Sequence, residues 1–157
     1  MDDHNTTAAA PAPTQAAAPA KTYQPDVPAT LELEGIDGQP LFNDDGSPMT
    51  IDMVGADSDI AIAARNQQQN RRLQQGQRLK LTAEALEADG ASYLAKLVTG
   101  WNLTPSKLIP GIDPGLGEGK VPFSAGAAAT LFKHPKLTFI KDQPDRFVGE
   151  RTHFLRA

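Results

Sequence analysis

The chain has 157 residues and a formal net charge of −4, and 39% of its residues are hydrophobic but only 6% aromatic. These values predict one domain with a small hydrophobic core, and the lack of cysteine excludes a disulfide framework and a thiolate metal site. No apolar run approaches the ~20 residues of a membrane span. The first residues also lack the basic region and apolar block of a secretory signal, so we expect a soluble, cytosolic protein with no membrane partner.

Charge is distributed unevenly along the chain. Residues 1–59 carry eleven acidic side chains and one basic side chain, Lys21, whereas residues 60–120 and 121–157 each carry a net charge of +3. This excess of bases is smaller than that of a dedicated nucleic-acid binder. The distribution favours contacts within the chain or with a protein partner, and it argues against nucleic acid as a partner.

Residues 1–29 are predicted to be a disordered arm. Nine alanines and five prolines dominate this segment, with almost no large apolar side chain. Such a composition buries too little apolar surface to offset the entropy of ordering.

Residues 30–55 are predicted to form a β-hairpin. Apolar and polar residues alternate around Leu31 and Leu33, and they alternate again in residues 49–53. The segment between them contains two Asp-Gly turn signals. It is long enough for a third short strand at residues 41–42.

Residues 57–98 are predicted to form two helices. Asp57 or Ser58 caps the first helix, and Thr82 opens the second. The first helix has only a thin apolar stripe, whereas the second has a fuller core face. That face consists of Leu86, Tyr93, Leu94, Leu97 and Val98.

Basic residues recur from the first of these helices to the start of the second. They are Arg65, Arg71, Arg72, Arg78 and Lys80, with no acidic residue between positions 60 and 83. A solvated helix face is the simplest interpretation, and a groove or phosphate contact is the functional alternative. No interleaved aromatic residue supports base stacking.

Residues 99–122 are predicted to be a long loop. Its glycines suggest a phosphate-binding loop, but Val121 stands where a Walker motif needs Ser or Thr. No strand precedes residues 115–117, as a dinucleotide-binding fingerprint requires. We interpret Trp101 as an anchor at the core or at a helix end, and we also include it among the candidates for partner contact.

Residues 123–156 are predicted to form two helices, and they hold the densest run of large apolar side chains. Ser124 is the expected N-cap of the first helix, and Pro135 ends that helix at His134. The second helix is expected to be about 15–20 residues long and to bend or restart at Pro144.

The apolar residues of the last helix are divided between two roles. We expect Phe147 and Val148 in the core, because they lie on the main apolar stripe. We expect Phe139, Phe154 and Leu155 at a partner-binding edge. Phe139 lies off the stripe, and the other two lie at a chain end.

No catalytic constellation is recognisable in the sequence. His4, His134 and His153 have neither metal-ligand spacing nor a matching nucleophile. A calcium loop around Asn43 fails because Leu41 would occupy its first ligand position. We therefore expect no enzymatic activity, no catalytic residue, no cofactor and no metal.

The fold expected from these elements is mainly α with a small N-terminal β-hairpin, an α+β arrangement. About four helices form a single small domain over residues 30–157, preceded by the disordered arm of residues 1–29.

Three short motifs in the second half of the chain occur together with the hairpin and the polar helix. They are Gly100 with Trp101, the helix start at Pro122, Phe123 and Ser124, and a terminal pattern of Phe147, Arg151, Phe154 and Leu155. This combination resembles the tail assembly chaperone-like proteins of long-tailed bacteriophages. The resemblance covers about residues 30–157. It leaves out the arm, and Pro144 departs from the aliphatic residue expected there.

The resemblance implies a small non-enzymatic protein that acts in the host cytoplasm during phage assembly. Such a protein would bind the tape measure protein, keep it soluble and help to bring the tail tube protein to it. The resemblance leaves open whether the protein forms a homo-oligomer. Two alternatives remain. One is a structural virion protein of the tail or of the head–tail joint, and the other is a small nucleic-acid-binding regulator.

Overall fold

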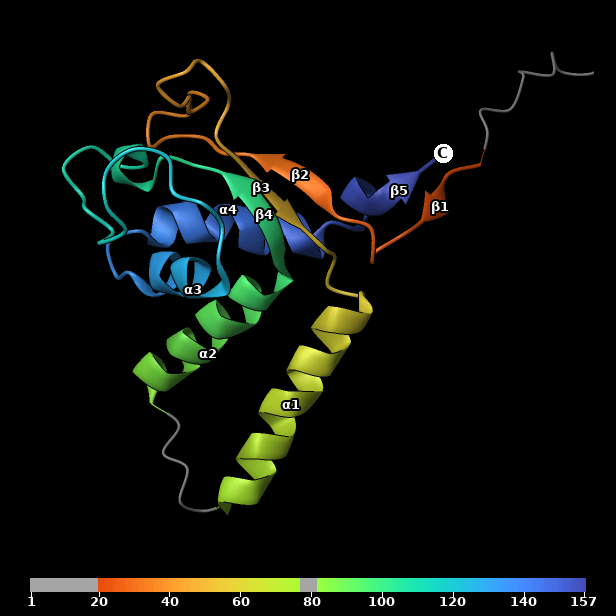
Figure 1. The fold of residues 1–157 in the computed structure, drawn as a ribbon. Coiled ribbons are helices and arrows are strands. Elements are labelled where there is room, and N and C mark those ends of the chain that lie inside the picture. Colours follow the sequence, from red (N-terminus) through yellow and green to blue (C-terminus); the bar gives the residue numbers. More distant parts are fainter. Residues whose placement is uncertain (1–19, 77–81) are drawn as a thin grey trace, which may run out of the picture.

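The computed structural model describes residues 20–76 and 82–157. Four α-helices and small antiparallel sheets make up this part of the chain, so the predicted α+β class is confirmed (Figure 1). The elements are β1 (Thr22–Tyr23), β2 (Ala29–Glu32), β3 (Thr50–Met53), α1 (Asp59–Gln75), α2 (Ala83–Leu97), β4 (Val98–Asn102), η2 (Pro105–Lys107), α3 (Ala125–Lys133), α4 (Thr138–Gly149), η3 (Arg151–Phe154) and β5 (Leu155–Arg156).

The helix starts follow local sequence signals. The side chains of Ser58, Thr82 and Ser124 accept hydrogen bonds from backbone N–H groups in the first turns of α1, α2 and α3, at 3.1, 3.1 and 3.0 Å. Each side chain satisfies a donor that has no partner within its helix. The predicted caps are therefore confirmed, with Ser58 chosen over Asp57 for α1.

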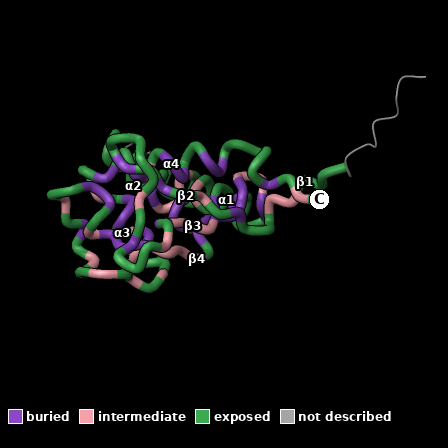
Figure 2. The backbone as a smooth tube through the Cα atoms, turned by 90° about the horizontal axis from the view of Figure 1, so that it is seen from above, coloured by how far each residue is buried: buried purple, intermediate pink, exposed green. Residues whose placement is uncertain are grey.

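The predicted hairpin pairs β2 with β3, and Leu31 lies opposite Ile51. Alternation along β3 buries Ile51 and Met53 completely, whereas Thr50 and Asp52 stay half-buried. α4 packs against β3, and α2, α3 and α4 pack against one another. Figure 2 shows the buried positions concentrated in this body.

A third strand was missed in the region predicted to be a loop. β4 follows α2 without an intervening turn and pairs antiparallel with β3, which gives the sheet order β2–β3–β4. The apolar pattern of α2 runs into Val98 with no turn signal, which concealed the change from helix to strand. Residues 41–42 do not form the third strand, because Phe42 makes only an isolated bridge to Pro48.

The arm prediction is wrong for residues 20–29. β1 pairs antiparallel with β5, so that Tyr23 lies opposite Leu155. The backbone N–H of Gln24 donates to Phe154, and that of Gly55 donates to Pro25, both at 2.8 Å. These contacts are made by the backbone, and composition therefore gave no sign of them. The remaining part of the predicted arm, 1–19, lies outside the described residues.

The last helix is shorter than predicted. α4 spans 12 residues and continues through Pro144, which is buried. A proline inside a helix lacks the N–H that would donate to the carbonyl four residues earlier, here that of Ile140, and the packing of this buried turn outweighs that loss. The chain leaves the helix at Gly149, and the 3-10 turn η3 then directs Phe154 inward.

Candidate partner-binding site

The four residues predicted to contact a partner do not form one surface. Phe139 on α4 and Leu155 on β5 are exposed, with 37% and 40% of their surfaces accessible. Trp101 on β4 is half-buried. Its indole Nε1 donates to the carbonyl of Val121 at 2.8 Å, and its ring meets that of Phe123 edge-to-face. Trp101 therefore anchors the long loop to the sheet, which agrees with its interpretation as an anchor residue.

Phe154 belongs to the core and not to the surface. Its side chain is 0% exposed and packs edge-to-face on Phe147. A Cβ placed at Gly55 would lie 3.3 Å from its ring, so this glycine leaves the room that the ring occupies. The prediction failed because it assumed a frayed chain end, whereas pairing of β5 with β1 holds that end in place.

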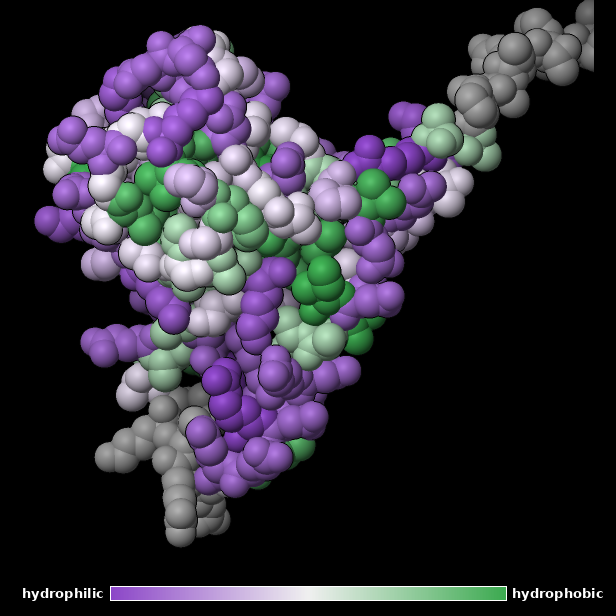
Figure 3. All heavy atoms as spheres, viewed as in Figure 1, coloured by the Kyte–Doolittle hydropathy of each residue, from purple (hydrophilic) through white to green (hydrophobic). Residues whose placement is uncertain are grey.

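An apolar groove opens instead between α1 and the body of the protein. We call it the Ile60 groove, and its volume is about 500 Å³. Figure 3 shows hydrophobic side chains gathered between α1 and the part of the body that carries α3. The groove is lined by Ile60, Ala63, Ala64 and Gln67 of α1, by Ala95 and Lys96 of α2, and by Val98, Phe123 and Ala125.

The spacing of the α1 residues explains why they share this groove. Positions 63, 64 and 67 lie three, four and seven residues after position 60, and the four positions therefore lie on one helix face. Ile60 is 47% exposed despite its size, and alanines make up half of the other lining residues. Small side chains let another backbone approach closely, so the groove suits a helix better than a bulky ligand.

The Ile60 groove continues into a polar trough along α1. The two hollows share Gln67 and Lys96, and the trough adds Arg71 and three amide side chains. Lys96 donates from Nζ to Oε1 of Gln67 at 3.2 Å. An occupant would therefore meet apolar side chains at one end and cationic and amide groups at the other.

Polar contacts attach α1 to α2. Arg65 donates to the hydroxyl of Tyr93 at 2.9 Å, and Arg72 donates to the carboxylate of Asp89 at 3.1 Å. Only Ala61 and Ala64 of α1 are buried. Arg71 also lies 3.7 Å from the Asp89 carboxylate. The three described residues of the basic run are therefore paired within the chain, which favours the solvated-face interpretation. Arg78 and Lys80 lie outside the described residues.

A charged cluster fixes the start of α1. Asp57 accepts hydrogen bonds from the Tyr23 hydroxyl at 2.5 Å and from Nε of Arg151 at 2.7 Å. Arg151, and then Tyr23, lower the pKa of the Asp57 carboxyl below its usual range. Desolvation and then the hydrogen bond to Asp57 raise the pKa of Tyr23. Asp26 also accepts from the N–H of Asp59 at 2.7 Å, at the first turn of α1.

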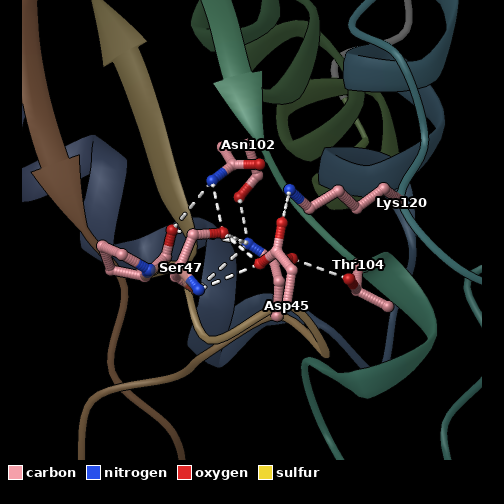
Figure 4. Close-up of polar contacts among 7 residues, drawn as sticks. Asp45, Ser47, Asn102, Thr104 and Lys120 are labelled. Atoms are coloured by element: carbon pink, nitrogen blue, oxygen red, sulfur yellow. Dashed lines mark hydrogen bonds and ion pairs between the residues drawn. The ribbon is translucent and has the colours of Figure 1, made fainter.

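Hydrogen bonds to other parts of the chain hold the loop around Asn43, which the sequence excluded as a calcium loop (Figure 4). The buried Asn43 side chain accepts from the Thr104 hydroxyl at 2.6 Å and donates to the carbonyl of Asn102 at 3.2 Å. Lys120, and then Ser47, lower the pKa of Asp45. These contacts fasten the β2–β3 connection to β4, which gives Asn43 a structural role that the sequence did not reveal.

Neither a metal site nor a membrane helix is found in residues 20–76 and 82–157. That part of the chain contains no cluster of three or more acidic or histidine side chains placed to hold an ion. None of its helices combines the length and the apolar character needed to cross a bilayer. The chain matches no protein-family model, no curated protein and no solved structure.

Proposed function

We propose that this protein is a non-enzymatic tail assembly chaperone of a long-tailed bacteriophage, and that it binds a helix of the tape measure protein. The Ile60 groove is the single observation that carries the proposal. It is an open apolar surface between α1 and the body of the protein, with four alanines in its lining, and helix-in-groove recognition uses surfaces of this kind.

The chemistry of the groove defines the segment that it would accept. The apolar end calls for aliphatic side chains at helical spacing, and the trough beyond it presents Arg71 and Lys96. An amphipathic helix with acidic residues at one end satisfies both halves. A tape measure protein consists of long helices, so shielding such segments in the host cytoplasm until the tail tube protein arrives is the role that this groove would serve.

Two isoleucines on α1 allow a matched test of the proposal. Ile60 lines the groove and Ile62 does not, although both are exposed to similar extents, 47% and 42%. We expect Ile60→Ser to reduce co-purification with the tape measure protein of the same phage by about tenfold or more, in line with loss of an interface hot spot. Ile62→Ser is the control and should leave the yield unchanged.

The outcomes also separate the proposal from its alternatives. Equal losses of co-purification in the two variants, or no loss in either, would show that the Ile60 groove does not bind the tape measure protein. Presence of the protein in purified virions at fixed stoichiometry, without co-purification of the tape measure protein, would favour a structural protein of the tail or head–tail joint. Self-association lost in Ile60→Ser alone would assign the groove to a homo-oligomer.

A further inference from the structure

The outer edge of β2 has backbone groups that no other strand of residues 20–76 and 82–157 pairs. β2 is an edge strand, with β3 on one side only. The N–H of Leu33 donates to Met49 at 3.0 Å, so the odd-numbered residues of this segment direct their backbone groups toward β3. Backbone groups alternate in direction along a strand, and those of Thr30 and Glu32 therefore point away from β3.

Side chains close this edge on both sides of Thr30 and Glu32. The amide of Gln143 accepts from the N–H of Glu34 and donates to its carbonyl, each at 2.8 Å. These are the two bonds that a neighbouring strand would make. At the other end, Arg156 donates to the carbonyl of Pro28 at 2.5 Å. A window of two outward-facing residues is left between these closures.

A groove of about 360 Å³ lies beside this window, between β2 and α4. We call it the Glu32 groove. The half-buried Leu31 contributes apolar surface to its lining, whereas the ring of Phe147 is buried and stacks on the ring of His153. The lining also carries three carboxylates, Glu32, Glu34 and Glu150, against the Arg146 guanidinium and the His153 imidazole, whose Nε2 lies 2.8 Å from the Glu150 carboxylate.

We propose that the Glu32 groove binds a short, extended, basic segment of a partner protein, which adds to the sheet as a strand beside β2. The segment's backbone pairs with the N–H and C=O groups of Thr30 and Glu32. One apolar side chain of the segment packs on Leu31, and flanking lysines or arginines face the glutamates. The excess of carboxylates selects a basic segment over an acidic one.

This surface is separate from the Ile60 groove and calls for a different partner conformation. A helix satisfies its own backbone groups and cannot pair with a strand edge. The two proposals therefore stand or fall independently, and one chain could hold a helix and an extended segment at the same time.

Three labelled peptides test the proposal in solution with the full chain. The first alternates lysine with valine, the second replaces lysine with glutamate, and the third keeps the first sequence but carries N-methyl groups on the backbone edge that would pair. Fluorescence anisotropy should show that the lysine peptide binds and that its affinity falls as salt is added. We expect the affinity of each of the other two peptides to be at least about tenfold lower. The glutamate peptide is repelled by the carboxylates, and the N-methylated peptide lacks the backbone donors that would pair with β2.

Variants of the protein locate the binding. Glu32→Gln combined with Glu34→Gln should weaken binding of the lysine peptide, and Thr30→Pro should remove an outward N–H without breaking the ladder to β3. Thr30→Val is the matched control for the proline variant, and thermal unfolding checks that each variant folds. Equal binding of the lysine and glutamate peptides, full binding of the N-methylated peptide, or no binding of any peptide would overturn the proposal. The N-methylated peptide decides the matter even if Thr30→Pro does not fold.

Discussion

Arg151 donates to Asp57 across 94 positions of the sequence, with 2.7 Å between Nε and Oδ2. The same carboxylate accepts from Tyr23, so a single acidic side chain connects β1, the start of α1 and the turn η3. This cluster lies at the start of α1, the helix that provides one wall of the Ile60 groove. The two ends of the described chain therefore help to define the proposed binding surface.

Asp57→Asn should alter how stability depends on pH. The pKa of Asp57 is lower in the folded protein than in the unfolded chain, where it is about 3.9. The stabilisation is therefore fully present above that unfolded value and is lost as the pH falls through the folded value. Thermal unfolding should show that the variant is less stable at neutral pH and that the difference disappears in acid. A constant difference over the whole pH range would contradict this assignment.

Phe154→Ala should destabilise the protein strongly. The side chain is fully buried against Phe147 and Gly55, so its loss leaves a cavity and should cost about 3–5 kcal/mol. Phe139→Ala removes the same group from an exposed position and should cost less than about 1 kcal/mol. Denaturant unfolding of both variants measures the difference. Similar values would mean that Phe154 is not a core residue.

Asn43→Ala should weaken the attachment of the β2–β3 connection. The substitution leaves the buried Thr104 hydroxyl and the Asn102 carbonyl without their partner, at a cost of about 1–3 kcal/mol. Asp44→Ala, next to it in the same loop, removes only an exposed ion pair with Lys107 and should change stability by no more than about 1 kcal/mol. Chemical denaturation of the two variants tests this ranking, and the reverse order would refute the role of Asn43.

Residues 20–27 should contribute to stability, in contrast to the expectation that the whole arm of residues 1–29 is disordered. A chain that begins at residue 28 lacks β1 and the bonds that join Gln24 to Phe154 and Gly55 to Pro25. Each lost bond is worth about 0.5–1.5 kcal/mol. Its melting temperature should therefore lie below that of a chain that begins at residue 20. Identical melting temperatures would show that the pairing of β1 with β5 adds nothing.

Local signals in the sequence were sufficient for much of the fold. Ser58, Thr82 and Ser124 each mark a helix start through a side chain that acts within three residues of its own position. The alternation around Leu31 and Ile51 likewise identified the paired strands, because the period of a strand is visible in a few residues.

The parts that were missed depend on distant partners. The Gln143 amide binds the backbone of Glu34, 109 positions away, and no local pattern indicates such a contact. Burial of Phe154 depends in the same way on the pairing of β1 with β5. The Ile60 groove escaped notice because a thin apolar stripe on α1 is equally compatible with a covered and an open helix face.

The most direct test of the central claim uses the absence of cysteine from the chain. Ala63→Cys and Ile62→Cys each introduce the only thiol, on exposed positions of α1 that lie inside and outside the Ile60 groove, respectively. An environment-sensitive fluorophore is attached to each thiol, and the tape measure protein is then added. We expect a blue shift and loss of quencher access at position 63 and no change at position 62. Equal responses at both positions, or a response at position 62 alone, would contradict it.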